Sequence, residues 1–166
     1  GILGVGAIGG FLASVFSNAG YNIVCFGKQS TINEISQTGL TLESAVYGNF
    51  KSFPTSHLKE GSNLDFLFIA TKTCYLDEAL AAFDKNLTSD ALIIPIMNGI
   101  GFRKKLKLFF GKNVLAGNIG LIEVHKEKNH IKHHNIKKTP KISLGTNLLS
   151  FNSKIDKISK ILNACK

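Results

Sequence analysis

The sequence has little cysteine and no long apolar run. Its 166 residues include only three cysteines, and no two of them form a Cys-x-x-Cys pair. This argues against a disulfide framework and a thiolate metal site, so we expect Cys25, Cys74 and Cys165 to be reduced, mostly buried small hydrophobic residues. No segment is apolar enough over sufficient length to cross a bilayer, and no basic segment followed by an apolar one marks a signal peptide. We therefore expect a soluble, cytoplasmic protein.

The sequence also lacks a linker, a shift in composition and an internal repeat. A length of 166 residues with 44% hydrophobic content suits one ordinary domain with a buried core. We therefore expect residues 1–166 to form a single domain. Gly1 already lies within what reads as the first strand, so we also expect the natural chain to begin a few residues earlier.

Acidic residues are scarce beside basic ones, 11 against 20, which gives a net charge of +9. Such an excess can indicate nucleic-acid binding. Much of it, however, lies in residues 125–141, where six lysines face one acidic residue, Glu127, outside any recognisable nucleic-acid motif. We therefore expect neither nucleic acid nor a membrane as a partner, and nucleic-acid binding is the last of the alternatives. The six lysines are Lys126, Lys128, Lys132, Lys137, Lys138 and Lys141.

Four histidines of the same segment raise the question of a metal. His125, His130, His133 and His134 match no standard spacing of metal ligands, and no cysteine or pair of carboxylates accompanies them. We interpret residues 125–141 as a solvated hairpin with alternating polar residues and predict no bound metal.

The most informative motif stands at the start of the chain. Gly4-Val5-Gly6-Ala7-Ile8-Gly9 follows an apolar strand end and precedes an amphipathic helical pattern, after which residues 21–26 read as a second strand. This order of strand, Gly-x-Gly-x-x-Gly and helix is typical of a dinucleotide-binding unit. The apolar stripe of the predicted helix consists of Phe11, Leu12, Val15, Phe16 and Ala19.

Each glycine of the motif has its own mechanical role. Gly4 allows a tight turn out of the strand, Gly6 lets a pyrophosphate approach the backbone, and Gly9 lets the helix pack closely on the sheet. The pyrophosphate would lie at the helix N-terminus near Ala7, where unpaired N–H groups and the positive end of the helix dipole converge. We therefore predict a cofactor site at Gly4 to Gly9. The alternative is a glycine-rich turn that binds nothing.

The end of the second strand bears on which cofactor would bind. An NAD-binding unit usually places an acidic residue there for the ribose 2′-hydroxyl, whereas this chain has Lys28. A cation beside hydroxyl and amide groups would attract a 2′-phosphate, so we predict NADP rather than NAD. The alternative is a solvated surface lysine.

Two later strands end in polar residues that can share this site. The apolar runs 64–70 and 91–97 are typical of parallel strands covered on both faces, and they lead to Lys72 and Asn98. Ligands of open α/β sheets bind beyond the carboxyl ends of the strands, so we predict that both side chains meet the cofactor or an acidic substrate. The alternatives are a solvated lysine and, for Asn98-Gly99, a hairpin turn.

The remaining patterns complete the predicted fold. Residues 32–62 are less regular, with a short hairpin between 39–43 and 47–53. The alternation of strands and helices predicts an α/β fold of the Rossmann type, a doubly wound, mostly parallel sheet with helices on both faces. Helices are predicted at 76–83, at 102–110 and from Asn152, capped by Asn152 or Ser153, and strands at 114–123, around 131 and at 142–144.

Three motifs together point to a family. Gly4-Val-Gly-Ala-Ile-Gly9, then Lys72-Thr73 after an apolar strand, then Asn98-Gly99-Ile100-Gly101, resemble the N-terminal domain of ketopantoate reductase (2-dehydropantoate 2-reductase) along nearly the whole chain. The resemblance implies an NADP-dependent oxidoreductase of pantothenate biosynthesis that reduces 2-dehydropantoate to pantoate with NADPH.

The resemblance also implies roles for individual residues. Gly4 to Gly9 would hold the pyrophosphate, and Lys28 would stand where the family usually has an arginine for the 2′-phosphate. Lys72 and Asn98 would lie beside the nicotinamide ribose and the small 2-keto acid substrate. Ile122, with Glu123 next to it, would flank the cofactor. The proton-donating lysine belongs to a helical C-terminal domain, which we expect downstream of this chain, so no catalytic residue is expected within residues 1–166 and this fragment alone should be inactive.

At two positions the sequence differs from the family pattern, which makes the expected substrate and cofactor preference less strict. Tyr75 stands where the family commonly has glutamine, and Lys28 keeps the positive charge of arginine without its planar fork. One alternative is a related oxidoreductase acting on another small keto or hydroxy acid. Another is a nucleotide-sensing domain without turnover. A homodimer is compatible with the sequence, which does not fix the oligomeric state.

Overall fold

The structure is a computed structural model that describes residues 1–99, 101–137, 139–146 and 152–165. In chain order its elements are β1 (Ile2–Leu3), α1 (Ala7–Asn18), β2 (Cys25–Phe26), α2 (Gln29–Thr38), β3 (Leu40–Ser44), β4 (Phe50–Ser52), β5 (Phe66–Ile69), the 3-10 helix η1 (Thr73–Tyr75), α3 (Leu76–Ala81), η2 (Lys85–Thr88), β6 (Leu92–Pro95), α4 (Phe102–Phe110), η3 (Gly111–Asn113), β7 (Ala116–Gly120), β8 (Val124–Glu127), β9 (His130–His133), β10 (Lys141–Gly145) and α5 (Asn152–Ala164).

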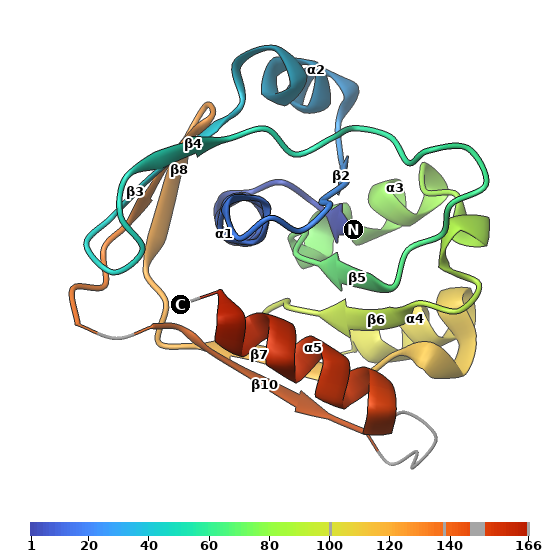
Figure 1. The fold of residues 1–166 in the computed structure, drawn as a ribbon. Helices are drawn as coiled ribbons and strands as arrows, with labels where there is room; N and C mark the ends of the chain where they lie inside the picture. Colours follow the sequence, from blue (N-terminus) through green and yellow to red (C-terminus); the bar gives the residue numbers. More distant parts are fainter. Residues whose placement is uncertain (100, 138, 147–151, 166) are drawn as a thin grey trace.

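A parallel sheet with helices on both faces forms the centre of the fold (Figure 1). Its strand order is β2-β1-β5-β6, and every neighbouring pair is parallel. Side chains alternate along β5, so Phe66 and Phe68 pack with α1 and α5, whereas Leu67 and Ile69 pack with α3 and α4. All four are buried, which explains the unbroken apolar run of this strand. The predicted α/β fold with a parallel sheet and helices is confirmed.

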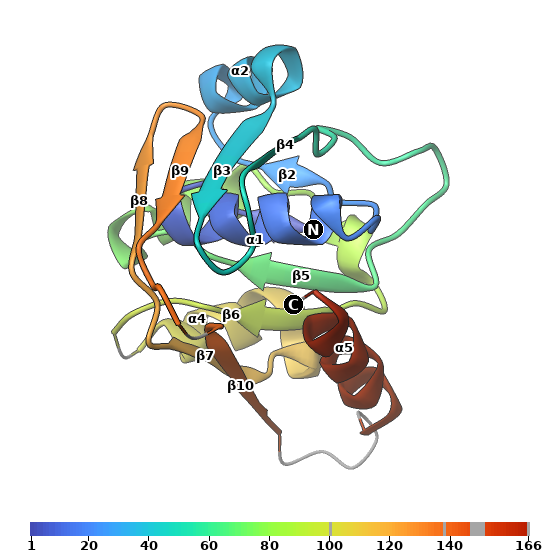
Figure 2. The same ribbon diagram turned by 60° about the vertical axis from the view of Figure 1, so that its left-hand side comes forward.

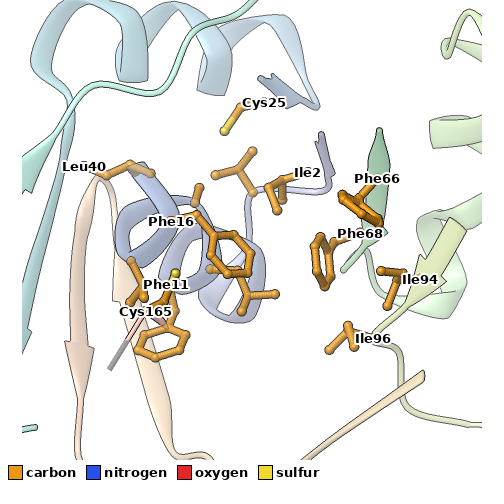
Figure 3. Packing of buried hydrophobic residues seen from close by; sticks show 14 of the residues in the cluster. Ile2, Phe11, Phe16, Cys25, Leu40, Phe66, Phe68, Ile94, Ile96 and Cys165 are labelled. Carbon is orange, nitrogen blue, oxygen red and sulfur yellow. The ribbon is translucent and has the colours of Figure 1, made fainter. Parts of the chain in front are cut away.

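The larger core cluster lies between α1 and the parallel sheet. Figure 3 shows Phe16 of α1 facing Phe68 of β5, with Ile94 and Ile96 beyond. The rings of Phe16 and Phe68 lie 5.4 Å apart between centroids. Complete burial of such side chains contributes roughly 1.5–3 kcal/mol each to stability. This packing fixes the position of α1 against the sheet, and with it the turn that leads into the helix.

Two further sheets, which the sequence analysis did not predict, surround α1. One has the order β4-β3-β9-β8, and the other pairs β7 with β10. The predicted hairpin after Gly39 is confirmed as the antiparallel pair of β3 and β4. Strand β9 then joins β3 in parallel, across a long separation in sequence. Figure 2 shows this sheet standing across α1, on the side opposite the parallel sheet.

The prediction that residues 32–62 are less regular is wrong for the first part of this range, where helix α2 continues to Thr38. Only Ile32 and Ile35 of this helix are buried, and the rest of its surface is polar. Two apolar positions in ten residues give only a weak helical period, so the sequence pattern does not indicate this helix. The helix ends at Gly39, whose φ of +70° lies in the left-handed region.

The hairpin predicted within residues 125–141 is present, but it is not solvated on both faces. Strands β8 and β9 pair in antiparallel fashion. Ile131 is fully buried and His133 is 3% exposed, because the alternation of β9 directs both toward α1, whereas His130 and Lys132 face solvent. Lys138 of this segment lies outside the described residues, as does the residue before Asn152 where a helix cap would stand.

The surroundings of His133 disfavour its charged form. The Ser44 hydroxyl accepts hydrogen bonds from the backbone N–H groups of Val46 and Tyr47, at 3.2 and 3.1 Å. Both acceptor positions of Oγ are thus used, so its proton points to His133 Nδ1 at 2.9 Å, and Nδ1 accepts. Burial lowers the pKa of His133, because the charged ring would lose its hydration.

This arrangement predicts a loss of stability in acid. As the pH falls through about 6.5, the unfolded chain takes up a proton at His133 that the folded chain resists, so unfolding is favoured. The free energy of unfolding, measured with urea between pH 7.5 and 5.5, should fall more for the wild type than for His133→Gln. The exposed His57 provides a control, since His57→Gln should keep the wild-type slope. Equal slopes for all three proteins would contradict this assignment.

The cysteine prediction holds for two of three positions. Cys25 and Cys165 are buried, and burial raises the pKa of the Cys25 thiol to about 12. Cys74 is exposed, because it lies in the 3-10 turn η1 at the edge of the parallel sheet. No helix among the described residues is long and apolar enough to cross a membrane.

Candidate functional site

The loop between β1 and α1 is built on close backbone approaches at two glycines. Gly4 has a φ of +94°, and a Cβ atom there would lie 2.7 Å from the backbone nitrogen of Thr71. A Cβ atom on Gly9 would lie 1.9 Å from the carbonyl oxygen of Gly4. Neither position can hold a larger residue, because the atoms in the way are backbone atoms. The loop is thereby folded tightly onto the carboxyl ends of β1 and β5.

Gly6 differs from these two glycines because space is open around it. A Cβ atom on Gly6 would meet no atom of the described part of the chain within 4 Å, and the residue is exposed. Its backbone, with φ of −74° and ψ of −158°, is one that any residue can adopt. Nothing in the fold of the described residues therefore requires glycine at position 6. A ligand that must touch the backbone would require it.

The N-terminus of α1 opens onto this space. The first intrahelical bond runs from the Gly10 N–H to the Gly6 carbonyl at 2.8 Å, so the N–H groups of Ala7 and Ile8 have no partner within the helix. No side chain among the residues that the structure describes caps the helix, and its first turn contains no acidic residue. Val5 is buried beneath the loop. The geometry suits an anion held by backbone N–H groups, with the helix dipole adding to the attraction.

The other predicted residues lie at the same edge of the sheet. Because the four strands are parallel, the segments after β1, β2, β5 and β6 all leave at their carboxyl ends. In Figure 2 the arrowheads of β5 and β6 point to the side where α1 begins. Lys72 directly follows the Thr71 that contacts Gly4, and the Thr73 hydroxyl donates to the Asn98 carbonyl at 3.0 Å. These contacts bring Lys72 and Asn98 to the edge where the glycine loop lies.

Lys28 lies at the end of β2, where it is the residue preceding the first turn of α2. Its side chain is exposed, and its ammonium stands 5.3 Å from the centre of the Tyr75 ring. Tyr75 belongs to η1, so this contact joins the loop after β2 to the loop after β5. In the sequence Tyr75 stands out only as a departure from the family, because a contact between residues this far apart along the chain leaves no local pattern.

Ile122 is half-buried in the connection between β7 and β8. The chain enters β7 parallel to β6, through a bridge between Val114 and Ile93, so this connection also lies toward the carboxyl edge. Asn135 holds it in place: its amide donates to the Leu121 carbonyl at 2.8 Å and accepts from the Glu123 N–H at 2.8 Å. Ile100, part of the motif after Asn98, lies outside the described residues.

One further lysine beside the loop was missed. The position of a Cβ atom on Gly10 lies 3.5 Å from Cδ of Lys126, which is half-buried on β8. Burial lowers the pKa of Lys126, while the charge of Glu34 opposes that shift. This lysine was assigned to a solvated hairpin, since the packing of β8 on α1 joins segments far apart in the sequence.

A cavity also lies elsewhere in the fold. It has a volume of about 700 Å³ and lies between α1, β7 and α5, with mainly apolar walls that include Phe16, Ile119 and Leu162, and with Lys137 and Lys141 also in its lining. Of helix α1, the cavity is lined only by residues from Phe11 onward, past the first turn. The N–H groups of Ala7 and Ile8 therefore do not line it. The described residues contain no group of three or more side chains that could hold a metal ion.

Comparisons with known proteins identify the family of this chain. Residues 1–146 match the family described as ketopantoate reductase PanE/ApbA. The 2-dehydropantoate 2-reductase of Pyrococcus abyssi is 30% identical over 113 residues, and that of Pyrococcus horikoshii is 27% identical over 113 residues. Each alignment covers 68% of this chain and 37% of the relative. The chain thus spans well under half the length of these relatives.

The fold is also that of solved structures. A D-mandelate dehydrogenase in complex with NADH and anilino(oxo)acetate superposes with a TM-score of 0.82 at 17% identity, over 99% of this chain and 53% of the dehydrogenase. At that identity the match establishes the fold alone. The family match covers most of the chain and includes the glycine loop, Lys72 and Asn98. This chain therefore belongs to the ketopantoate reductase PanE/ApbA family.

Proposed function

We propose that this chain is the cofactor-binding part of an NADPH-dependent reductase that converts 2-dehydropantoate (ketopantoate) to pantoate. The observation that carries the proposal is the open space at Gly6. Two neighbouring glycines are required by backbone contacts, whereas a Cβ atom on Gly6, beside the N-terminus of α1, would meet no atom of the described residues within 4 Å. A pyrophosphate resting on the backbone accounts for glycine at this position.

The proposed roles follow from the arrangement at the carboxyl edge. The N–H groups of the Gly4 to Gly9 loop bind the pyrophosphate, and Lys28 binds the 2′-phosphate, in a Rossmann-type, doubly wound domain. Lys72 and Asn98 orient the nicotinamide ribose and the keto acid, since a lysine supplies positive charge for a carboxylate and an asparagine can both donate and accept. Ile122 covers the cofactor from the connection after β7.

The reaction assigns separate tasks to cofactor and protein. Bound NADPH supplies hydride, and the protein supplies position, charge and exclusion of water. The proton for the product hydroxyl comes, in our proposal, from a lysine of a helical domain beyond this chain. The substrate is a small 2-keto acid. The fold shared with D-mandelate dehydrogenase favours a second candidate, a reductase of a different 2-keto acid at the same cofactor site.

The charge at Lys28 provides the test of cofactor choice. Lys28→Glu replaces the cation with an anion, so the affinity for NADPH should fall by about 10- to 100-fold, the value of one or more hydrogen bonds to a charged group. The affinity for NADH should change by less than about twofold. Calorimetric titration of the purified protein with both dinucleotides measures the two affinities.

A matched control is available at Lys112, which is exposed in η3 at the start of β7, the opposite end of the strands. Lys112→Glu makes the same change of net charge and should leave both affinities unaltered. Equal losses for NADPH and NADH in Lys28→Glu would refute the role of Lys28 at the 2′-phosphate.

A further inference from the structure

The contact between Lys28 and Tyr75 is the least expected feature of the carboxyl edge. The Lys28 ammonium stands 5.3 Å from the ring centre, within the distance at which an aromatic face attracts a cation. Tyr75 is 48% exposed, so its side chain is accessible at this edge. Among the described residues, no carboxylate lies within 4.0 Å of Lys28 Nζ. The ring is therefore the group that constrains this ammonium.

The backbone holds both members of the pair. The Tyr75 N–H donates to the Lys72 carbonyl at 2.9 Å, and the Thr73 hydroxyl ties the same turn to the Asn98 carbonyl at 3.0 Å. On the other side, the Lys28 carbonyl accepts from the Ile32 N–H at 3.0 Å in the first turn of α2. Each side chain thus starts from an anchored point, and the ring limits where the flexible lysine side chain can go.

We propose that Tyr75 is a positioning residue that holds the Lys28 ammonium at the ribose end of the dinucleotide site and thereby sets the preference for NADPH over NADH. This inference rests on the proposed function. A lysine carries a compact charge on a flexible stem and loses much rotamer freedom when it binds a phosphate. A ring that already restricts the ammonium reduces the rotamer freedom that Lys28 loses on binding. The resulting gain in affinity applies only to a dinucleotide with a 2′-phosphate, because only that ligand contacts Lys28.

The test compares three substitutions at position 75 with both dinucleotides. Tyr75→Leu removes the aromatic face and should weaken NADPH by about two- to fivefold, the worth of an exposed cation–π contact, without changing the affinity for NADH. Tyr75→Phe keeps the face and should match the wild type. Tyr75→Gln has no aromatic face and should behave as Tyr75→Leu. Melting temperatures of the unliganded variants check that all remain folded.

A double-mutant cycle separates positioning from direct contact with the cofactor. In a Lys28→Met background, Tyr75→Leu should no longer affect the affinity for NADPH, because there is no ammonium left to position. Equal weakening of NADPH and NADH by Tyr75→Leu, or a loss that persists in the Lys28→Met background, would overturn the inference and leave the proposed function standing. Absence of binding of either dinucleotide to the wild type would overturn both.

Discussion

Gly9→Ala is expected to destabilise the protein by at least about 3 kcal/mol, a large part of the roughly 5–15 kcal/mol that stabilises an ordinary domain. In an ordinary helix this substitution would add roughly 0.5–1 kcal/mol of stability, because alanine has the higher helix propensity. Here the new Cβ atom would lie 1.9 Å from the Gly4 carbonyl oxygen and 3.2 Å from Cβ of Ala70. To make room, α1 must move away from β1 and β5, and its packing with Phe68 is then lost.

The neighbouring glycine offers a control within the same helix. A Cβ atom on Gly10 would lie 2.9 Å from Cδ1 of Ile131 and 3.5 Å from Cδ of Lys126, which are side-chain atoms rather than backbone atoms. Gly10→Ala should therefore cost much less than Gly9→Ala, when the free energies of unfolding are compared by urea denaturation. Similar values for the two variants would show that the contact between Gly9 and Gly4 does not set the position of α1.

Gly6→Ser is expected to have the opposite profile, with stability kept and affinity lost. The open space at Gly6 admits the side chain, and the extended backbone at this position suits serine, a preferred residue at helix N-termini. The free energy of unfolding should stay within about 0.5 kcal/mol of the wild type or rise. The hydroxyl, however, takes up an N–H group of the first turn and fills the space against the backbone. NADPH should then bind about 10- to 100-fold more weakly.

Gly145 provides the matched substitution away from the site. It pairs with Ala116 at the start of β7, and a Cβ atom there would make an ordinary contact of 3.8 Å. Gly145→Ser should leave both stability and NADPH affinity near their wild-type values. Calorimetric titration gives the affinities and urea denaturation the stabilities. If Gly6→Ser bound NADPH as tightly as the wild type, the loop would not be the pyrophosphate site.

Local sequence patterns could predict those helices and strands whose apolar residues recur at a clear spacing between turn residues. The predicted bounds of α4 agree with the structure, because apolar residues recur at helical spacing between Gly101 and Gly111. Helix α2 was missed because only Ile32 and Ile35 mark its buried face. The pairing of β3 with β9 was also beyond reach, since partners distant in sequence leave no local pattern.

The same division applies to the candidate site. The glycine loop, Lys28, Lys72 and Asn98 were predicted from their places after strands, and parallel strands bring such places to one edge whatever the loops contain. Ile122 came from the family resemblance alone. The contact of Tyr75 with Lys28, and that of Lys126 with the start of α1, depend on packing between loops and sheets. Such contacts follow only from three-dimensional structure.

The most direct test of the account is a titration of the isotope-labelled protein with NADPH, followed by the shifts of its backbone amide signals. We predict the largest changes at Gly6, Ala7 and Ile8, the N–H groups that face the open space, and a second set at Lys28 and Lys72. The cofactor site would be contradicted if the signals of the glycine loop did not move and the shifts were confined to the residues that line the cavity between α1 and α5.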